Sequence, residues 1–173
     1  MIPTDTVYGL AAGAEHAEAV ERIYSLKDRP SDKSLQLLVP DGEWLERLGM
    51  PSADARLLAR RYWPGPLTIV VPSASGTIGL RVPANGLALK LLRRTGPLAA
   101  TSANRSGEQT PSDVESIREL FGDTVDVYVD GGVIDGVAST VVDTTGPEIV
   151  VVREGAVSAS EIMRALECGF EAG

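Results

Sequence analysis

Short runs of β-branched and aliphatic residues alternate with helical patterns along almost the whole chain. We expect strands at Leu35–Val39, Leu67–Val71, Ile78–Val82, Leu98–Ala100, Val125–Val129, Thr140–Asp143 and Glu148–Arg153. We expect helices at Glu15–Leu26, Ser52–Tyr62, Leu87–Arg93, Ser112–Phe121 and Ser158–Cys168. This alternation restricts the chain to an α/β layered fold, in which helices cover a sheet.

The expected sheet contains strands of both directions. Only Pro72–Thr77 separates Leu67–Val71 from Ile78–Val82, which is too short for the helical crossover that two parallel strands need. This pair must be antiparallel, and the sheet is therefore mixed parallel and antiparallel. No repeat or linker divides the 173 residues, a length that is ordinary for one domain. We expect a single domain over residues 1–173, a twisted mixed sheet with flanking helices.

Two of the expected helices carry sequence signals at their ends. A Ser followed three residues later by Glu is typical of a capping box, which satisfies the free N–H groups of the first turn. Glycine just beyond a helix favours a left-handed cap. The capping boxes are Ser112 with Glu115 and Ser158 with Glu161, and the expected glycine caps are Gly122 and Gly169.

Composition excludes several classes of protein. Cys168 is the only cysteine and His16 the only histidine, so we expect no intramolecular disulfide, cysteine zinc site or Ser-His-Asp hydrolase. The net charge is −8, but residues 1–106 carry 13 Lys and Arg against 10 Asp and Glu, whereas residues 107–173 carry 3 against 14. An extended nucleic-acid surface is disfavoured, while the first part is compatible with a basic pocket for a small anion. Without a membrane-length apolar run or a signal-like N-terminus, we expect a cytoplasmic location.

A cluster of cations follows the first expected helix. Lys27 and Arg29 precede Pro30, which disfavours helical geometry at Arg29, and Lys33 follows. Side chains two positions apart on an extended chain point to the same side, so the pair would form a clamp for a phosphate or carboxylate. The same charges would also favour the end of the helix as a solvated cluster. The sequence leaves both interpretations open.

Small polar side chains form a second candidate site. Ser102 and Asn104, within Thr101–Gly107, follow the apolar Leu98–Ala100, and ligands of α/β sheets bind at the carboxyl ends of strands. Their hydroxyl and amide groups would bind phosphate oxygens or a nucleobase without adding charge. Arg81 lies within an apolar run and requires an anionic partner if it is buried. The sequence leaves two alternatives for this anion: the carboxylate of a substrate, or an acidic side chain of the protein in a structural salt bridge.

Taken in order along the chain, these motifs resemble the YrdC/YciO family, which includes the threonylcarbamoyl-AMP synthases. Each motif alone is weak, but the ordered set is specific and extends over nearly the whole chain. The matching segments are Pro3–Leu10, Lys27–Pro30 with Lys33, Trp63–Thr68, Gly79–Pro83, Gly96–Pro97 leading into Thr101–Gly107, Ser139–Asp143 and Arg153–Gly155. The resemblance implies a YrdC-like fold.

The resemblance also implies a reaction. The synthases of the family convert L-threonine, bicarbonate and ATP into threonylcarbamoyl-AMP and pyrophosphate, the first step of N6-threonylcarbamoyladenosine (t6A) modification at tRNA position 37. We therefore expect a nucleotidyltransferase that uses ATP and bicarbonate as substrates, with Mg²⁺ arriving with ATP. The expected partners are L-threonine and proteins of the t6A pathway, and RNA binding is left open.

The family's site residues carry over onto this chain one by one. The implied catalytic cations are Lys27 and Arg29. The implied ATP-binding residues are Arg29, Lys33, Thr77, Ser102, Asn104, Thr110 and Arg153. The implied threonine-binding residues are Thr6, Arg81, Ser139 and, through its backbone, Ala100, with Arg81 pairing with the carboxylate of the amino acid.

Three departures from the family pattern accompany the resemblance. The chain begins almost inside the motif at Pro3, so we expect a short N-terminal segment of the domain to be missing. It ends soon after the last expected helix, as in the short members, which hand their labile product to partner proteins. Leu38 stands where longer members often have His, so we expect the contacts to threonine to differ there.

Three alternatives remain open from the sequence. A YciO-like paralogue would share the fold but have low or different activity. A carbamoyl-transfer domain like that of hydrogenase-maturation proteins would use carbamoyl phosphate and ATP, although the accompanying acylphosphatase and zinc-finger segments are absent from this sequence. A double-stranded RNA-binding module would use a basic patch, for which the candidates are Arg56, Arg60, Arg61, Arg93 and Arg94.

Overall fold

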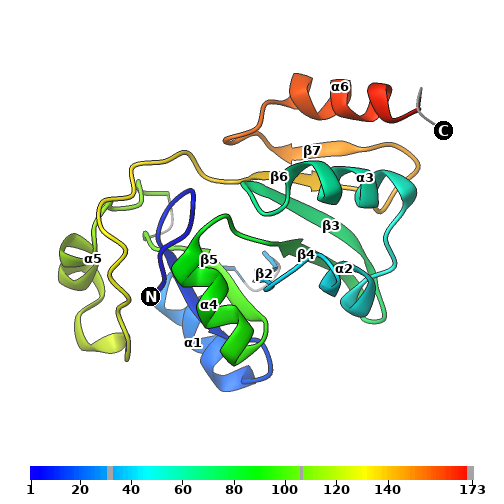
Figure 1. The fold of residues 1–173 in the computed structure, drawn as a ribbon. Helices are drawn as coiled ribbons and strands as arrows, with labels where there is room; N and C mark the ends of the chain where they lie inside the picture. Colours follow the sequence, from blue (N-terminus) through cyan, green and yellow to red (C-terminus); the bar gives the residue numbers. More distant parts are fainter. Residues whose placement is uncertain (31–32, 106, 171–173) are drawn as a thin grey trace.

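The computed structural model describes residues 1–30, 33–105 and 107–170, which form an α/β fold around one seven-stranded sheet (Figure 1). The strands are β1 (Gly9–Gly13), β2 (Gln36–Leu38), β3 (Leu67–Ser73), β4 (Gly76–Arg81), β5 (Leu98–Ser102), β6 (Thr140–Asp143) and β7 (Val150–Arg153). The helices are α1 (Ala17–Leu26), α2 (Trp44–Leu48), α3 (Ala53–Tyr62), α4 (Gly86–Thr95), α5 (Val114–Phe121) and α6 (Ala159–Phe170), with a 3₁₀ turn at Gly122–Thr124.

The strands run in both directions, as predicted, in the order β1-β5-β2-β4-β3-β6-β7. The predicted antiparallel pair is confirmed, since β3 and β4 form a hairpin with Val70 opposite Gly79. Two pairs, β2 with β4 and β3 with β6, are parallel. The pairs β1 with β5, β2 with β5 and β6 with β7 are antiparallel. The sheet is therefore mixed throughout.

The two faces of the central strands have different roles. Leu67, Ile69 and Val71 of β3 are fully buried and pack in one apolar cluster with residues of α3 and α6. Each such side chain contributes about 1.5–3 kcal/mol of hydrophobic stabilisation. Because successive residues of a strand point to opposite faces, Thr68 and Val70 of the same strand face away from this core. That second face carries the candidate site.

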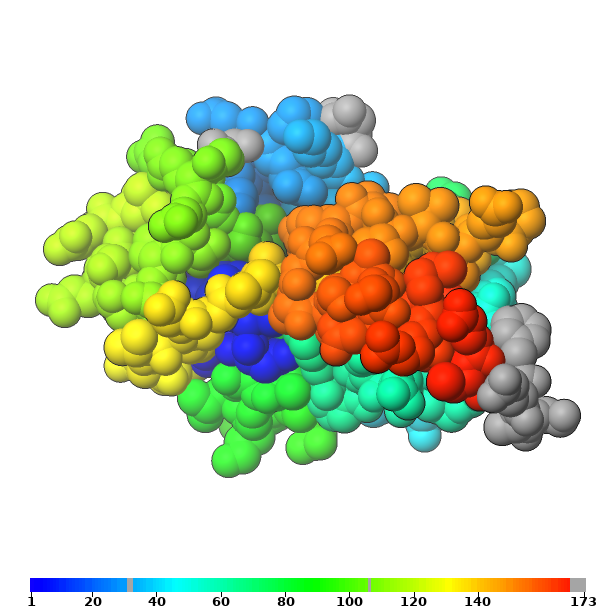
Figure 2. All heavy atoms as spheres, turned by 90° about the horizontal axis from the view of Figure 1, so that it is seen from above, coloured from blue at the N-terminus to red at the C-terminus, as the bar shows by residue number. Residues whose placement is uncertain are grey.

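The strand predicted at Val125–Val129 is wrong, because the segment between α5 and β6 is not part of the sheet. The segment runs across the N-terminal residues instead, as Figure 2 shows in yellow over dark blue. Its anchors are two pairs of hydrogen bonds. Met1 N donates to Val127 O at 2.6 Å and Val129 N donates to Met1 O at 3.0 Å, while the Tyr8 hydroxyl donates to Gly132 O at 2.7 Å and accepts from Gly131 N at 2.9 Å. Val125 has extended backbone, with φ of −116° and ψ of 122°, but the segment is not part of a ladder with a neighbouring strand.

One of the two predicted capping boxes is confirmed. Ser158 N donates to Glu161 Oε2 at 2.9 Å, and Glu161 N donates to Ser158 Oγ at 3.3 Å. The other box, Ser112 with Glu115, is wrong. Asp113 caps α5 instead, because its Oδ1 accepts from the backbone N–H three residues further on at 2.8 Å. The carboxylate suits the positive end of a helix better than a hydroxyl.

The two predicted glycine caps also differ in outcome. Gly122 directly follows α5 with a positive φ of +52°, which favours glycine, but its ψ of −139° differs from that of the predicted left-handed cap. Gly169 is not a cap, because α6 continues to Phe170. Two elements were not predicted from the sequence, the strand β1 and the short helix α2. The other strands and helices match their predictions with small shifts at the ends.

Candidate functional site

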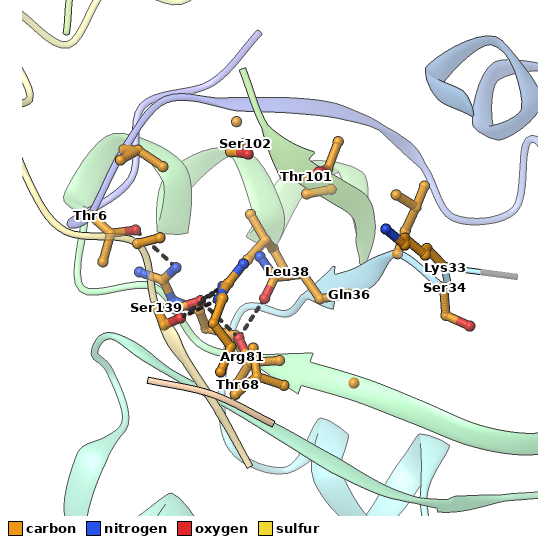
Figure 3. Close-up of a pocket in the computed structure, with 18 of the residues that line it drawn as sticks. Thr6, Lys33, Ser34, Gln36, Leu38, Thr68, Arg81, Thr101, Ser102 and Ser139 are labelled. Carbon is orange, nitrogen blue, oxygen red and sulfur yellow. Dashed lines mark hydrogen bonds between the residues drawn. The ribbon is translucent and has the colours of Figure 1, made fainter. Parts of the chain in front are cut away.

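A cavity of about 630 Å³ opens on the face of the sheet opposite the α3 and α6 core (Figure 3). Alternate residues of β4, namely Thr77, Gly79 and Arg81, line it, as do Thr68 and Val70 of β3. The ends of β2, β5, β6 and β7 complete the wall together with the residues after α1. The cavity therefore collects side chains from segments spread over most of the sequence.

The charge of the cavity is opposite to that of the whole chain. Five cationic side chains are among its described lining residues, and no Asp or Glu is among them, although the chain carries a net charge of −8. The five are Lys27, Arg29, Lys33, Arg81 and Arg153. Low-dielectric walls lined by one sign of charge concentrate ligands of the other sign, so the cavity favours an anion.

The end of α1 positions two of these cations through a Schellman turn. Arg29 N donates to Tyr24 O at 3.0 Å. Asp28 N donates to Ser25 O at 3.4 Å, which completes the pair of backbone bonds that defines this turn. Asp28 takes the left-handed position, with φ of +46°. The extended backbone predicted for this segment is therefore wrong at Lys27, which has φ of −105° and ψ of 0°, and at Asp28, but the side chains of Lys27 and Arg29 line the same cavity.

Lys27 is buried and joins α1 to the loop after β5. Its side chain is 4% exposed, and Nζ lies 2.5 Å from Ser102 O, 3.3 Å from Asn104 Oδ1 and 3.5 Å from Thr101 Oγ1. Desolvation, followed by the charge of Arg29, lowers the pKa of Lys27 from 10.5 to about 8. Lys27 is thus both a cation of the cavity and a structural link.

Arg29 lies close enough to two other cations of the cavity, Lys27 and Arg153, for its charge to act on both. Its Nε donates to Lys33 O at 2.9 Å and its Nη2 to Ser34 O at 3.0 Å. A guanidinium carries five N–H donors, so most of them are not used by these two bonds. Desolvation and then the charge of Arg29 lower the pKa of Arg153, as they lower that of Lys27. Bringing cations so close is unfavourable unless an anion binds among them.

Asn104 organises the loop that follows β5. Its Oδ1 accepts from Ser102 Oγ at 2.5 Å and from Thr110 Oγ1 at 3.3 Å. Its Nδ2 donates to Arg105 O at 2.7 Å and to Glu108 O at 2.8 Å. Both amide donors are therefore engaged within the loop, and the observed role of Asn104 is to shape the cavity wall.

Arg81, at the end of β4, has an anionic partner in the protein itself. It is 2% exposed, and its Nη2 donates to Asp5 Oδ1 at 2.6 Å. Nη1 donates to Thr6 Oγ1 and Nε to Gly65 O, both at 3.0 Å. Desolvation is the largest cause of its lowered pKa, and Asp5 opposes it. The structural salt bridge, one of the two alternatives from the sequence, is therefore present. The three hydrogen bonds use three of the five N–H groups of the guanidinium, so two remain for a ligand.

A row of polar side chains crosses the floor of the cavity (Figure 3). Arg153 Nη2 donates to Ser139 O at 2.7 Å and to Ser139 Oγ at 3.1 Å. Ser139 Oγ lies 3.1 Å from Thr68 Oγ1, and Thr68 Oγ1 donates to Gln36 Oε1 at 2.5 Å. Sequence reasoning missed Gln36 and Thr68 as site residues, although a lone Gln within the apolar run of β2 is a recognisable signal for a buried polar contact.

The structure brings almost all of the predicted site residues to one cavity. The lining includes Thr6, Lys27, Arg29, Lys33, Thr77, Arg81, Ala100, Ser102, Asn104, Ser139 and Arg153. Thr110 is not among the lining residues and lies behind Asn104. Leu38 also lines the cavity, and Ser106 of the second motif lies outside the described residues. Which substrate each of these residues binds stays a prediction.

The arginines considered for RNA binding lie on α3 and α4, away from this cavity. Arg56 is paired with Glu46 at 2.6 Å, while Arg60, Arg61, Arg93 and Arg94 are exposed. Within residues 1–30, 33–105 and 107–170, no group of three or more His, Cys, Asp or Glu is placed to hold a metal ion. None of the helices in the same ranges is long and apolar enough to span a membrane.

Comparisons with known proteins place the chain in a family. The Sua5/YciO/YrdC family model, described as telomere recombination, matches residues 1–155. A Mycobacterium tuberculosis protein provisionally named threonylcarbamoyl-AMP synthase is 42% identical over 178 residues, which cover 96% of this chain and 82% of that protein. The threonylcarbamoyl-AMP synthase of Pyrococcus abyssi is 38% identical over 95% of this chain, which spans only 52% of that protein.

Solved structures of relatives have the same fold. The crystal structure of P. abyssi Sua5 complexed with L-threonine superimposes with a TM-score of 0.89 at 38% identity, over 95% of this chain and 52% of that one. The crystal structure of Escherichia coli YciO gives a TM-score of 0.84 at 31% identity, over 92% of this chain and 84% of that one. With the family model matching residues 1–155, this chain belongs to the Sua5/YciO/YrdC family.

Proposed function

We propose that this chain is a threonylcarbamoyl-AMP synthase, a transferase that forms threonylcarbamoyl-AMP and pyrophosphate from L-threonine, bicarbonate and ATP for t6A modification of tRNA. The observation that carries the proposal is one cavity with five cations, no carboxylate among its described lining residues, and a floor of hydroxyl groups. Cations suit a polyphosphate, and hydroxyl groups suit a small amino acid. The names of the P. abyssi relatives support the same reaction.

The threonine would bind at the end of the cavity around Arg81. The two N–H groups of Arg81 that its three protein bonds leave over would receive the carboxylate of the amino acid. Thr6 and Ser139, both 2% exposed, would surround the polar groups of the substrate, and the backbone of Ala100 would complete the pocket. Asp5 fixes the guanidinium in place before the ligand arrives, which reduces the ordering cost of binding.

The ATP would bind along the cations at the other end. The amine nitrogen of threonine bonds to the carbon of bicarbonate while a C–O bond of bicarbonate breaks, so that water leaves and a carbamate remains. A carbamate oxygen then bonds to the α-phosphorus while the bond from that phosphorus to the bridging oxygen breaks, and pyrophosphate leaves. Arg29, Lys33 and Arg153 would neutralise the charge of the phosphates, and Lys27 would hold the Ser102 loop against them. Thr77, Ser102, Asn104 and Thr110 would contribute neutral contacts, with Asn104 and Thr110 acting through the loop. Positioning and charge neutralisation are the main contributions that such a site makes to a displacement at phosphorus.

Mg²⁺ would enter with ATP, bound chiefly by phosphate oxygens and water as is usual for this ion. The described lining residues supply no carboxylate for it. The residues of the chain would then act on the free phosphate oxygens that the ion does not reach.

The test is pyrophosphate release from ATP with and without L-threonine, in bicarbonate buffer containing Mg²⁺. Release that requires both threonine and bicarbonate supports the proposal. Folded protein that releases no pyrophosphate contradicts the proposal and favours a YciO-like paralogue, since Escherichia coli YciO is 31% identical to this chain. RNA binding with steep salt dependence and no turnover would instead favour a binding module.

A further inference from the structure

Gln36, Thr68 and Ser139 form a hydrogen-bonded row that reaches over an intervening strand (Figure 3). Gln36 belongs to β2 and Thr68 to β3, and β4 runs between these strands with Gly79 at this level. A Cβ on Gly79 would lie 3.4 Å from Thr68 Cγ2 and 3.8 Å from the Gln36 Cβ. The absence of a side chain there allows Gln36 and Thr68 to meet above β4.

The row has a defined direction because each hydroxyl has a single proton. Thr68 donates its proton to Gln36 Oε1 at 2.5 Å. In its 3.1 Å contact with Ser139, Thr68 must therefore accept, and Ser139 must donate. Arg153 Nη2 donates to the same Ser139 oxygen at 3.1 Å. Ser139 Oγ is left with one lone pair and no proton to offer a ligand.

Burial keeps water from changing this arrangement. Thr68 and Ser139 are each 2% exposed, and Arg153 holds Ser139 from the other side through its carbonyl and its hydroxyl. A buried hydroxyl that loses its partner must find another within the protein or the ligand. The direction of the hydrogen bonds in the row therefore decides whether Ser139 presents a donor or an acceptor to a ligand in the cavity.

The chemistry of the proposed reaction fits an acceptor at this point, and the following inference rests on that proposed function. The amine nitrogen of threonine must use its lone pair to attack the carbon of bicarbonate. A hydroxyl that donated to the nitrogen would occupy this lone pair, whereas one that accepts from N–H leaves it free. Ser139 and Arg81 line the same cavity, and Arg153, which donates to Ser139, lies close enough to Arg81 for its charge to act on that guanidinium. A threonine carboxylate on Arg81 would therefore bring the amine on the adjacent carbon toward Ser139.

We propose that Ser139 accepts a hydrogen bond from the amine of L-threonine, and that Gln36 and Thr68 are positioning residues that keep Ser139 an acceptor. Gln36 acts from two side chains away, through the proton of Thr68. Neither Gln36 nor Thr68 is required to touch the substrate for this role.

The first test replaces the middle of the row. Thr68→Val removes the acceptor for the Ser139 proton, which then turns toward the cavity. We expect the KM for L-threonine to rise about tenfold, the value of one hydrogen bond of ordinary strength, with the KM for ATP unchanged. Thr68→Ser restores the hydroxyl and should restore the KM for threonine. An unchanged threonine KM in Thr68→Val, or an equal rise in the KM for ATP, overturns the proposal.

The second test reverses the row without altering Ser139 or Thr68. In Gln36→Met the Thr68 proton loses its acceptor and turns to Ser139, where it occupies the free lone pair. We expect the same rise in the KM for threonine. Gln36→Glu keeps an acceptor and should stay within about twofold of the unsubstituted protein. If Gln36→Glu raises the KM for threonine more than Gln36→Met does, the proposed direction of the hydrogen bonds in the row is overturned. Gln36 is only half-buried, so its variants remain informative if Thr68→Val does not fold.

The matched control is Thr144→Val, which removes another buried threonine hydroxyl of the sheet region. Thr144 is 3% exposed, and its Oγ1 donates to Val70 O at 2.7 Å. We expect a lower melting temperature and an unchanged threonine KM, and a raised KM in this variant would overturn the specific role of the row. If the unsubstituted protein shows no threonine-dependent turnover, the proposed function fails. Normal turnover with normal threonine KM in Thr68→Val and Gln36→Met overturns the row alone.

Discussion

The side-chain nitrogen of Lys27 lies 3.3 Å from the side-chain oxygen of Asn104, although 77 positions separate the two residues. This contact turns two separate motifs of the sequence into one structure. It also changes the interpretation of Lys27, which is buried against the loop of Ser102 and Asn104 rather than free in solvent. A substitution of Lys27 therefore affects both the charge of the cavity and the shape of its wall.

We predict that Lys27 titrates near pH 8 rather than near 10.5. The chain contains only three lysines, so carbon NMR of labelled lysine side chains can follow Lys27 directly. Arg29→Gln should raise the pKa of Lys27, because desolvation remains but the repulsion by Arg29 is removed. An unchanged pKa in this variant would show that Arg29 does not act on Lys27.

The same titration has opposite consequences for stability and activity. Between pH 8 and 10.5 the unfolded state keeps the Lys27 proton that the folded state has lost. Stability then rises with pH over this window, because the unfolded state binds more protons. Turnover should fall in the same window, because the cavity loses a cation. Parallel pH profiles of turnover and of denaturant midpoint check this; a rise in both would exclude a catalytic role for the charge.

We predict that Arg29→Ala lowers turnover by about 100-fold, the effect of removing one preorganised charge-stabilising donor. The fold should be retained, because Arg29 is only half-buried and bonds in the structure to two carbonyl groups of its own loop. Pyrophosphate release and a thermal unfolding curve measured on the same preparation check both parts. Full turnover in this variant would remove Arg29 from the site.

We predict that Asp28 tolerates glycine and does not tolerate valine. Its φ of +46° lies in the left-handed region, which glycine adopts freely. For a β-branched residue this region costs about 1–2 kcal/mol or more. Asp28→Gly should keep or slightly raise stability. Asp28→Val should lower both stability and turnover, because it displaces Lys27 and Arg29 together. Equal behaviour of the two variants in thermal unfolding and turnover would contradict the role of this turn.

We predict that Asp5→Asn is strongly destabilising, by about 3 kcal/mol, because it leaves a buried guanidinium without its charge partner. The side chains of Arg81 and Asp5 are 3% and 14% exposed, and their atoms lie 2.6 Å apart. Glu46→Gln is the matched control, since the Glu46–Arg56 pair has the same 2.6 Å distance but is exposed. Denaturant unfolding should show no clear change for the control. Similar losses in both variants would refute the distinction.

Most of the fold follows from local sequence patterns because burial of one face imposes a period. The alternating Leu67, Ile69 and Val71 identify β3. β1 shows the limit, since its Gly and Ala residues carry little strand propensity and it forms by pairing along its whole length with β5. Val125–Val129 shows the reverse, because strong strand propensity does not create a partner strand.

The residues of the candidate site also differ in how far local sequence patterns predict them. Cations and small hydroxyl residues in loops are visible in a sequence, and almost all of those predicted here line the cavity. Thr68 is not visible in this way, because threonine is also favoured in strands for its shape. The burial of Lys27 and the ion pair of Arg81 with Asp5 depend on contacts between distant segments. Local patterns carry no information about such contacts.

The cavity wall draws on residues from Thr4 to Arg153, with contributions from strands at both edges of the sheet order. A partly synthesised or partly unfolded chain therefore offers its ligands no binding site at all. Ligands that bind only the finished fold stabilise it as a whole, by mass action. A shift in melting temperature on adding ATP or threonine would accordingly report the integrity of the entire molecule, from the first strand to the seventh.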